Sequence, residues 1–278
     1  MSGAAEHSGD AAQPYGDFAQ LRAERRGDGV VLVALDAPER RNAMSEAMTD
    51  SWGRLMAVLR LDREVRCVVV TGAGAAFCSG GDVGWIGSTP DATVDALRER
   101  MLPFYRTWLA VRELEVPTVA AIGGAAIGAG LALALACDLR YAAEDAVLAA
   151  PFTALGMHPG MATSWLLPQA VGLPVARELL LTGRPVRGAE AVSLGLVNQA
   201  FPRERLLDEA LAVAARIAAA APVATRLTKV ALADGGPASY AAALQWEALA
   251  QPVTLATEDL QEGLRASQEK RAPRFTGR

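Results

Sequence analysis

Short apolar runs alternate with longer mixed stretches along most of the chain. The runs at residues 67–71 and 118–122 are almost wholly apolar and are followed by glycine, which is typical of strands buried in a parallel sheet. Residues 21–26 and 30–35 predict a hairpin around the Gly-Asp-Gly turn at residues 27–29. Two shorter strands are expected at residues 139–141 and 147–149.

The stretches between these runs carry apolar residues at helical spacing. Ser45 is a predicted N-cap, because residues 48, 52, 55, 56 and 59 place apolar side chains on one helix face. Further helices are expected at residues 91–114, at about 130–137, and throughout the chain from Glu204 onward, with a new start at Pro222. Strand, loop and helix therefore alternate, which predicts a parallel α/β architecture followed by a helical region.

Composition and charge exclude several classes of function. The chain has 278 residues, a net charge of −4 and a pI of about 5.4, so it lacks the basic field of a nucleic-acid-binding protein. Its three cysteines lack a C-x-x-C pair, which favours reduced thiols in the cytoplasm over disulfides or a metal site. The small polar segment 1–16 is expected to be a disordered leader and not a signal peptide.

One uncharged segment is long enough to be tested as a membrane span. Residues 116–137 carry no charge, but Pro117 and glycines at positions 123, 124, 128 and 130 interrupt them. A β-branched first part and a Leu/Ala-rich last part indicate a buried strand, a glycine turn and a buried helix. No membrane partner is expected.

Two glycine-rich loops follow the two buried strands. The first, TGAGAAFCSGGD at residues 71–82, lacks the lysine of a phosphate-binding P-loop and ends on an aspartate. The second, GGAAIGAG at residues 123–130, precedes an apolar helix, so the N–H groups of Ala129 and Gly130 lie at a helix N-terminus. Together the loops can aim backbone donors, such as the N–H of Gly81, at one oxyanion.

The order of these segments resembles the enoyl-CoA hydratase/isomerase (crotonase) superfamily. The matching segments, in one colinear order over about residues 18–278, are LDAPERRNA at 35–43, the loop at 71–82, AIGGAAIGAG at 121–130, ACDL at 136–139, LGLVN at 194–198, and EKR at 269–271 followed by Phe275. The resemblance implies a crotonase-like ββα spiral over residues 17–200 and an α-helical C-terminal trimerisation region over residues 201–278. It further implies a homotrimer or a dimer of trimers acting on an acyl-CoA thioester without a further cofactor.

The resemblance also assigns roles to particular positions. Gly81 matches the first oxyanion-hole position and Ala129 the second. Lys270 matches a C-terminal lysine that reaches a CoA phosphate, often across a subunit boundary, although a solvated tail charge explains it equally well. The residues that match the CoA-binding loops are Ala43, Ser79, Gly81 and Asp82.

Three positions depart from the family pattern. The two glutamates of the hydratases are replaced by Ala132 and Phe152, which can neither hold water nor move a proton. The aspartate of some isomerising or dehalogenating relatives would fall near Gly160. His158 is the candidate substitute acid or base, although a hydrogen bond to loop backbone explains it as well. Other candidates for positioning substrate or water, which local capping or packing also explains, are Tyr105, Thr153, Thr163 and Ser164.

The reaction itself is left open at this point. The leading hypothesis is an enzyme of the enoyl-CoA hydratase/isomerase family, a lyase or isomerase of fatty acid metabolism that stabilises a thioester oxyanion or enolate. Decarboxylation of an acyl thioester is an alternative, since it needs the oxyanion hole and an apolar pocket but not the glutamates. A non-catalytic acyl-CoA-binding protein is the other alternative.

Overall fold

The computed structural model describes residues 13–278, and residues 1–12, which form most of the expected leader, lie outside this range. A seven-stranded sheet has the order β1-β2-β3-β4-β6-β8-β11, and a four-stranded sheet has the order β10-β9-β7-β5. The strands of the larger sheet are β1 (Gln13–Pro14), β2 (Leu21–Arg25), β3 (Val30–Leu35), β4 (Cys67–Gly72), β6 (Thr118–Ile122), β8 (Leu139–Ala143) and β11 (Gln199–Phe201). Those of the smaller sheet are β5 (Ala76–Cys78), β7 (Ala125–Ile127), β9 (Val147–Ala149) and β10 (Val186–Arg187).

The central strands of the larger sheet are parallel. β4 lies between β3 and β6, β8 follows β6, and β11 pairs with β8, all in parallel. β2 and β3 form the expected antiparallel hairpin. The apolar runs in β4 and β6 are buried, as their composition predicts. Because parallel neighbours end at the same edge of a sheet, the loops after β4 and β6 emerge side by side.

Each of three strands in the larger sheet leads into a short strand of the smaller one. β4 is followed by β5, β6 by β7 and β8 by β9, and a helix comes after each pair. This repetition confirms the predicted spiral of ββα turns. β5 and β7 lie inside the predicted glycine loops and have no strand signal of their own, because each has three residues and neither shows an alternating pattern.

The helices of the spiral begin and end at recognisable signals. The hydroxyl of Ser45 caps α1 by accepting a hydrogen bond from the N–H of Met48 at 3.2 Å, as predicted. The expected long helix at residues 91–114 is α3 followed by a 3-10 turn. The helices are α1 (Glu46–Leu61), α2 (Val83–Ile86), α3 (Val94–Leu109), α4 (Ala129–Ala136), α5 (Thr163–Thr182), α6 (Gly188–Ser193) and α7 (Arg203–Ala218). The 3-10 turns are Gly27–Gly29, Pro38–Arg40, Ala110–Glu113, Thr153–Leu155 and Ala233–Gly235.

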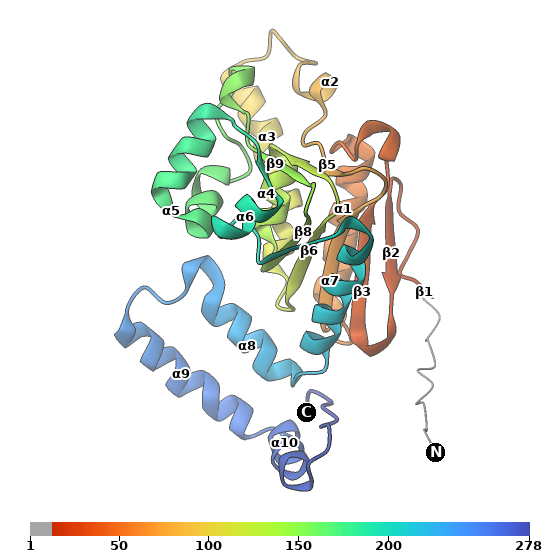
Figure 1. The fold of residues 1–278 in the computed structure, drawn as a ribbon, viewed down its shortest axis with the longest axis vertical. Coiled ribbons are helices and arrows are strands. Elements are labelled where there is room, and N and C mark those ends of the chain that lie inside the picture. The colour runs from red at the N-terminus through yellow and green to blue at the C-terminus, as the bar shows by residue number, and fades with distance from the viewer. Residues whose placement is uncertain (1–12) are drawn as a thin grey trace.

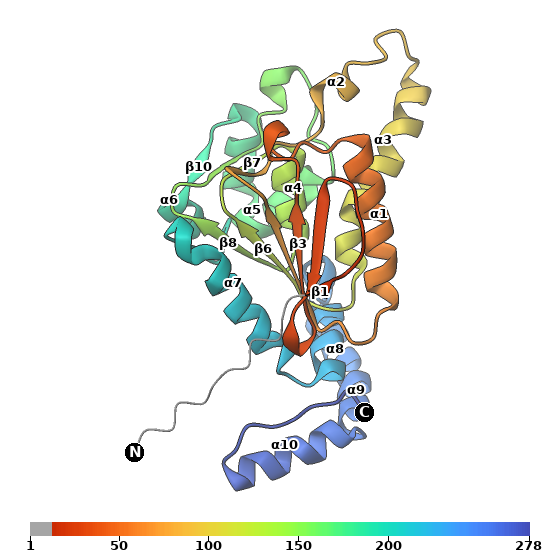
Figure 2. The same ribbon diagram turned by 90° about the vertical axis from the view of Figure 1, so that its right-hand side faces the viewer.

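Helices cover both sides of the larger sheet. Figure 2 shows α7 on one side and α1 with α3 on the other. The indole rings of Trp52 in α1 and Trp108 in α3 stack with their centroids 5.1 Å apart, which joins these two helices. α4 is buried along almost its whole length and packs against α5 and β7, so the ends of both glycine loops are held inside the molecule.

The C-terminal helices extend away from the sheets (Figure 1). They are α8 (Pro222–Leu232), α9 (Tyr240–Leu255) and α10 (Glu258–Glu269). The expected helical region began at residue 201, but α7 packs on β4, β6 and β8 and therefore belongs to the spiral. The reason is its apolar face, on which Leu206 and Ala210 are buried. None of the helices in residues 13–278 is both long and apolar enough to cross a membrane.

The predicted boundary of the leader at residue 16 also differs from the structure. Gln13 and Pro14 pair with β2, so residues 13–14 are part of the larger sheet. The hydroxyl of Tyr15 donates a hydrogen bond to the carboxylate of Asp62 at 2.6 Å. The polar composition of this segment did not reveal these partners, because they lie far away along the chain.

The two glycine loops are held together by contacts that leave no room for a side chain. A Cβ atom built on Gly124 would lie 2.0 Å from the carbonyl oxygen of Ala75, and one on Gly130 would lie 2.1 Å from that of Cys78. Gly80 has φ +96°, and a Cβ there would lie 2.7 Å from the carbonyl oxygen of Ile127. Only glycine allows the two backbones to approach this closely.

We expect Gly124→Ala to destabilise the protein and the neighbouring Gly123→Ala to be tolerated. The added methyl at position 124 overlaps the backbone of Ala75, whereas at position 123 its nearest neighbour is a Leu206 methyl at 3.9 Å. Denaturant unfolding should show a loss of about 1–3 kcal/mol for the first variant and within about 0.5 kcal/mol for the second. Equal stabilities of the two variants would contradict the close contact.

Candidate active site

A cavity of about 340 Å³ lies where the loops after β5, β7 and β9 meet α2 and α3. Trp85 and Phe104 form part of its wall, with their ring centroids stacked 5.0 Å apart. Its other large apolar side chains are Ile86, Met101, Ile127, Phe152, Leu155, Met157 and Met161. Its polar side chains are Ser79, Tyr105 and His158, and none of the described residues that line it is acidic. The cavity is therefore an apolar chamber with few polar groups.

The residues predicted to form the oxyanion hole both line this cavity. Gly81 follows β5, and Ala129 is the first residue of α4. Their loops touch, since a Cβ built on Gly80 would lie 3.3 Å from the backbone nitrogen of Ala129. Within the described residues, neither the N–H of Gly81 nor that of Ala129 donates a hydrogen bond. Two unused backbone donors thus border one apolar space.

Local backbone geometry explains why these donors are unused. Gly128 precedes α4 with φ +56°, and its own N–H donates to the carbonyl of Ala149 at 2.8 Å. The helical hydrogen bonds begin with the N–H of Ala132, which donates to Gly128 at 3.0 Å. Ala129 is therefore in the first turn, where backbone N–H groups lack intrahelical partners and the helix dipole favours negative charge.

Ala132 and Phe152, the two positions at which the resemblance predicts glutamates in hydratases, differ in location. Ala132 is fully buried in α4 and does not line the cavity. Phe152 is 8% exposed and does line it, with its ring 3.6 Å from a Cβ built on Gly128. The cavity wall beside Gly128 thus carries an aromatic ring.

His158 lies on the wall of the cavity and is exposed. Its Nδ1 is 2.8 Å from the carbonyl oxygen of Pro159, so Nδ1 carries the proton and donates it to this bond. That tautomer leaves Nε2 as the basic nitrogen. Thr163, another polar candidate, donates to the carbonyl of Gly160 at 2.6 Å, and Thr153 donates to the carbonyl of Leu180 at 3.3 Å. These two threonines are used in local hydrogen bonds.

Of the residues predicted to bind CoA, Ser79, Gly81 and Asp82 lie in the first glycine loop. Ser79 lines the cavity, and Ala43 is half-buried beside it in the chain segment that contacts this loop. Asp82 forms an ion pair with Arg40 and accepts a hydrogen bond from the N–H of Trp85 at 3.0 Å, so its carboxylate holds the start of α2. A shallow hollow beside Asp82 and Arg40 shares Trp85 with the cavity.

Lys270 is not brought to the cavity of its own chain. It ends α10 in a left-handed conformation with φ +54°, and Figure 1 shows α10 at the opposite end of the molecule from α2. The following segment folds back because Arg271 pairs with Glu262 at 2.6 Å. Hydrogen bonds from this arginine and from the N–H of Arg274 lower the pKa of Glu262 to about 2. The segment that carries Lys270 is thus anchored at the remote end.

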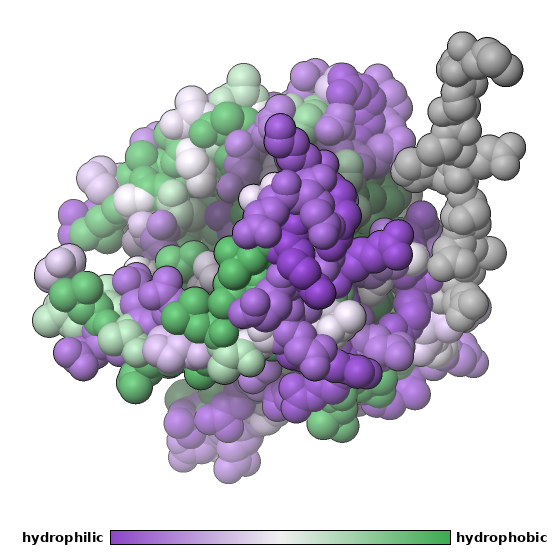
Figure 3. All heavy atoms as spheres, turned by 90° about the horizontal axis from the view of Figure 1, so that it is seen from below, coloured by the Kyte–Doolittle hydropathy of each residue, from purple (hydrophilic) through white to green (hydrophobic). Residues whose placement is uncertain are grey.

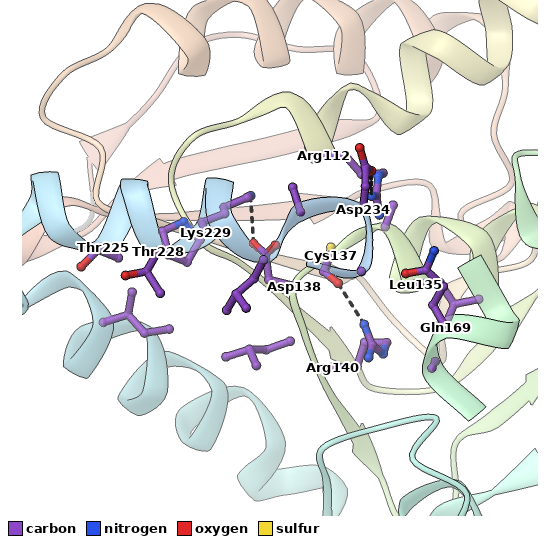
Figure 4. Close-up of a pocket in the computed structure, with 18 of the residues that line it drawn as sticks. Arg112, Leu135, Cys137, Asp138, Arg140, Gln169, Thr225, Thr228, Lys229 and Asp234 are labelled. Carbon is purple, nitrogen blue, oxygen red and sulfur yellow. Dashed lines mark hydrogen bonds and ion pairs between the residues drawn. The ribbon is translucent and has the colours of Figure 1, made fainter. Parts of the chain in front are cut away.

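A second cavity, of about 590 Å³, lies between the spiral and α8 (Figure 4). Lys229 pairs with Asp138 at 2.9 Å and donates to the carbonyl of Val116 at 2.8 Å. Arg112 pairs with Asp234 at 2.8 Å on another side of the space. These two ion pairs attach α8 and the turn after it to the spiral, and Arg140 donates to the carbonyls of Cys137 and Leu196, so the apolar cavity is the better candidate for an active site.

Sequence reasoning missed much of the cavity wall. Met101 and Phe104 come from α3, for which the sequence predicted only a long helix, whereas Tyr105 on the same helix was already a candidate for positioning substrate or water. The aromatic and methionine spacing along α3 was the available signal, but the same spacing is typical of an ordinary core-facing helix. Within residues 13–278, no group of three or more His, Cys, Asp or Glu residues is placed to hold a metal ion.

Fold and site together define an α/β protein with two backbone donors at an apolar ligand chamber. A family profile described as enoyl-CoA hydratase/isomerase matches residues 25–278. The mouse protein named enoyl-CoA hydratase domain-containing protein 2, mitochondrial, is 36% identical over 255 residues, covering 90% of this chain and 85% of that protein. The chain belongs to the enoyl-CoA hydratase/isomerase family.

Solved structures agree with this assignment. The crystal structure of enoyl-CoA hydratase from Bacillus anthracis superposes with a TM-score of 0.88 at 33% identity, covering 94% of this chain and all of that one. An enoyl-CoA hydratase from Polaromonas superposes with a TM-score of 0.86 at 28% identity, covering 92% of this chain and 99% of that one. The predicted α/β class with a helical C-terminal region is thereby confirmed.

We expect the cysteines to resist labelling in the native protein. Burial raises the pKa values of Cys67, Cys78 and Cys137 to about 12, so at pH 8 the thiolate fraction is on the order of 10⁻⁴. A colorimetric thiol reagent should react with all three only after unfolding in guanidinium chloride. Rapid labelling of Cys78 in the native state would contradict its burial.

Proposed function

We propose that the protein is an acyl-CoA enzyme that stabilises a thioester oxyanion or enolate with the N–H groups of Gly81 and Ala129. The observation that supports this most directly is the pair of unused backbone donors beside an apolar cavity. Such donors interact weakly with a ground-state carbonyl and strongly with a developing negative charge, each contributing about 3 kcal/mol in a transition state. The apolar wall strengthens this interaction because it excludes water.

The proton step falls to His158 in this proposal. Ala132 and Phe152 have no titratable group, so water activation by two glutamates is not available. The Nε2 atom of His158 remains free to take or give a proton, because Nδ1 is held by the carbonyl of Pro159. The His158 imidazole at the cavity wall is therefore a group that can accept a proton through Nε2 and return it later in the reaction.

Decarboxylation of a carboxyacyl-CoA is the second candidate reaction. It is favoured by the lack of acidic residues among the described lining residues and by the ring of Phe152. A substrate carboxylate would lose its water in such a cavity. The C–C bond then breaks, CO₂ leaves, and the electron pair enters the enolate held by the two N–H groups. Protonation of the enolate carbon completes the step.

CoA binding and assembly extend the same proposal. The adenosine end of CoA would follow the hollow beyond Trp85, past Ala43, Ser79 and Asp82, and Lys270 would reach its phosphate from a neighbouring subunit.

A homotrimer or dimer of trimers is supported by apolar residues at the C-terminal end, where Figure 3 shows hydrophobic residues reaching the surface. These exposed residues include Leu232, Tyr240, Leu249, Val253 and Leu255. No cofactor besides the thioester is needed, and a cytoplasmic location stays a prediction.

The proposal is tested by titrating crotonyl-CoA, a longer enoyl-CoA and methylmalonyl-CoA while product is measured in the same samples. Product from an enoyl-CoA supports hydration or isomerisation, and product only from the carboxyacyl-CoA supports decarboxylation. Tight binding without product would define a non-catalytic acyl-CoA-binding protein. No binding of any acyl-CoA would refute the proposal.

We expect Ala129→Pro to lower the turnover number by about 10²–10³-fold, because it removes one of the two donors. Proline is tolerated at the first position of a helix, as Pro222 at the start of α8 illustrates. Steady-state kinetics and melting temperature should be measured together. Glu258→Pro, which places proline at the first position of the distant α10, is the matched control and should keep wild-type turnover.

A ligand pair gives the same test without a variant. Butyryl-CoA and its thioether analogue S-butyl-CoA differ only in the carbonyl that the donors would bind. The wild-type protein should bind the thioether about tenfold more weakly. Equal affinities would show that the two N–H groups do not contact the thioester oxygen.

We expect His158→Ala to reduce turnover by about 10²–10⁴-fold while leaving the dissociation constant for the acyl-CoA within about twofold. The exposed Thr153→Ala, in the same loop, serves as the control. Unchanged turnover in the histidine variant would assign the proton step to another group.

A further inference from the structure

The hydroxyl of Tyr105 is a polar group in the cavity that the oxyanion hole, the proton step and the proposed CoA contacts do not use. Tyr105 belongs to α3, and its neighbours in the cavity wall include Met101, Phe104 and Met161. The side chain is half-buried. Within residues 13–278 the hydroxyl makes no hydrogen bond to another group of the protein. A hydroxyl in an apolar wall without a protein partner is poised to bond to whatever occupies the cavity.

Gly160 leaves the space in which this hydroxyl sits. A Cβ atom built on Gly160 would lie 2.6 Å from the Tyr105 oxygen and 3.1 Å from its Cζ atom. Any side chain at position 160 would therefore collide with the tyrosine ring. The carbonyl of Gly160 is already engaged by the hydroxyl of Thr163 at 2.6 Å. Gly160 thus leaves room for the Tyr105 hydroxyl but does not form a hydrogen bond with it.

Burial determines the chemical form of this group. It raises the pKa of Tyr105 above its ordinary value, so the side chain is a neutral hydroxyl at physiological pH. A neutral phenol both donates and accepts a hydrogen bond, and it strongly prefers a bound oxygen acceptor to an apolar chain. It comes from α3, whereas Gly81 lies in the loop before α2 and Ala129 is the first residue of α4. The cavity thus offers a second polar point besides the oxyanion donors.

We propose that Tyr105 is a specificity-determining residue that selects acyl-CoAs carrying an oxygen acceptor on the acyl group, such as an oxo, hydroxy or carboxy group. The inference rests on the proposed function, because it assigns the acyl end of the same ligand to this cavity. A saturated or simple enoyl chain would leave the hydroxyl unpaired when it displaces water from the cavity, which weakens its binding. An oxygenated acyl group satisfies the hydroxyl and also gains the contact with the apolar wall.

The test compares butyryl-CoA with acetoacetyl-CoA and 3-hydroxybutyryl-CoA, which match it in length and add one oxygen. Isothermal titration calorimetry gives the dissociation constants for the wild type, Tyr105→Phe and Gly160→Ala. The wild type should bind the oxygenated ligands about tenfold more tightly than butyryl-CoA. Tyr105→Phe should lose this preference and keep its affinity for butyryl-CoA within about twofold. Gly160→Ala should lose it as well, because the added methyl displaces the hydroxyl without removing it.

Tyr141→Phe is the matched control, since Tyr141 lies on β8 against Phe201 with ring centroids 6.0 Å apart and does not line the cavity. This variant should keep the full preference. The inference is overturned if the wild type binds all three ligands equally, or if Tyr105→Phe weakens all three alike. Failure of the wild type to bind any acyl-CoA would instead overturn the proposed function, so the two failures are distinguishable.

Discussion

The close packing of two glycine loops is the constraint on which the candidate active site depends. Gly124 against Ala75 and Gly130 against Cys78 bring the ends of β5 and β7 to within backbone contact. Because these approaches leave no room for a side chain, the relative position of the loops is determined by the main chain alone. Gly81 and Ala129 belong to these loops. Their N–H groups are therefore positioned by the backbone and not by flexible side chains.

The apolar character of the cavity follows from how the remaining wall is built. Phe152 places an aromatic ring beside the second glycine loop, and α3 contributes aromatic rings and a methionine. Charged groups near the site are paired elsewhere, as Asp82 is with Arg40. In such surroundings a half-buried polar group such as Tyr105 has more influence on an electrostatic step than it would in water.

The C-terminal helices are attached to the spiral through polar contacts at one end. Lys229 bridges Asp138 and the carbonyl of Val116, and Arg66 donates to the carbonyls of Ala218 and Phe275. Apolar residues of α9 face outward in the single chain. The same region carries Lys270. Subunit contact through this exposed apolar surface would therefore also bring Lys270 to a neighbouring subunit, as its proposed role requires.

The sequence by itself determined the parallel strands, the cap at Ser45, the two glycine loops and the lack of carboxylates at positions 132 and 152. These are properties of neighbouring residues, for which composition, spacing and colinear order are sufficient. The tertiary structure alone decided that α7 covers the sheet, that residues 13–14 join it, and that Tyr105 meets Gly160 in the cavity. Such contacts join segments distant along the chain, and equally amphipathic helices such as α7 and α8 have no local signal that says which one packs on the sheet.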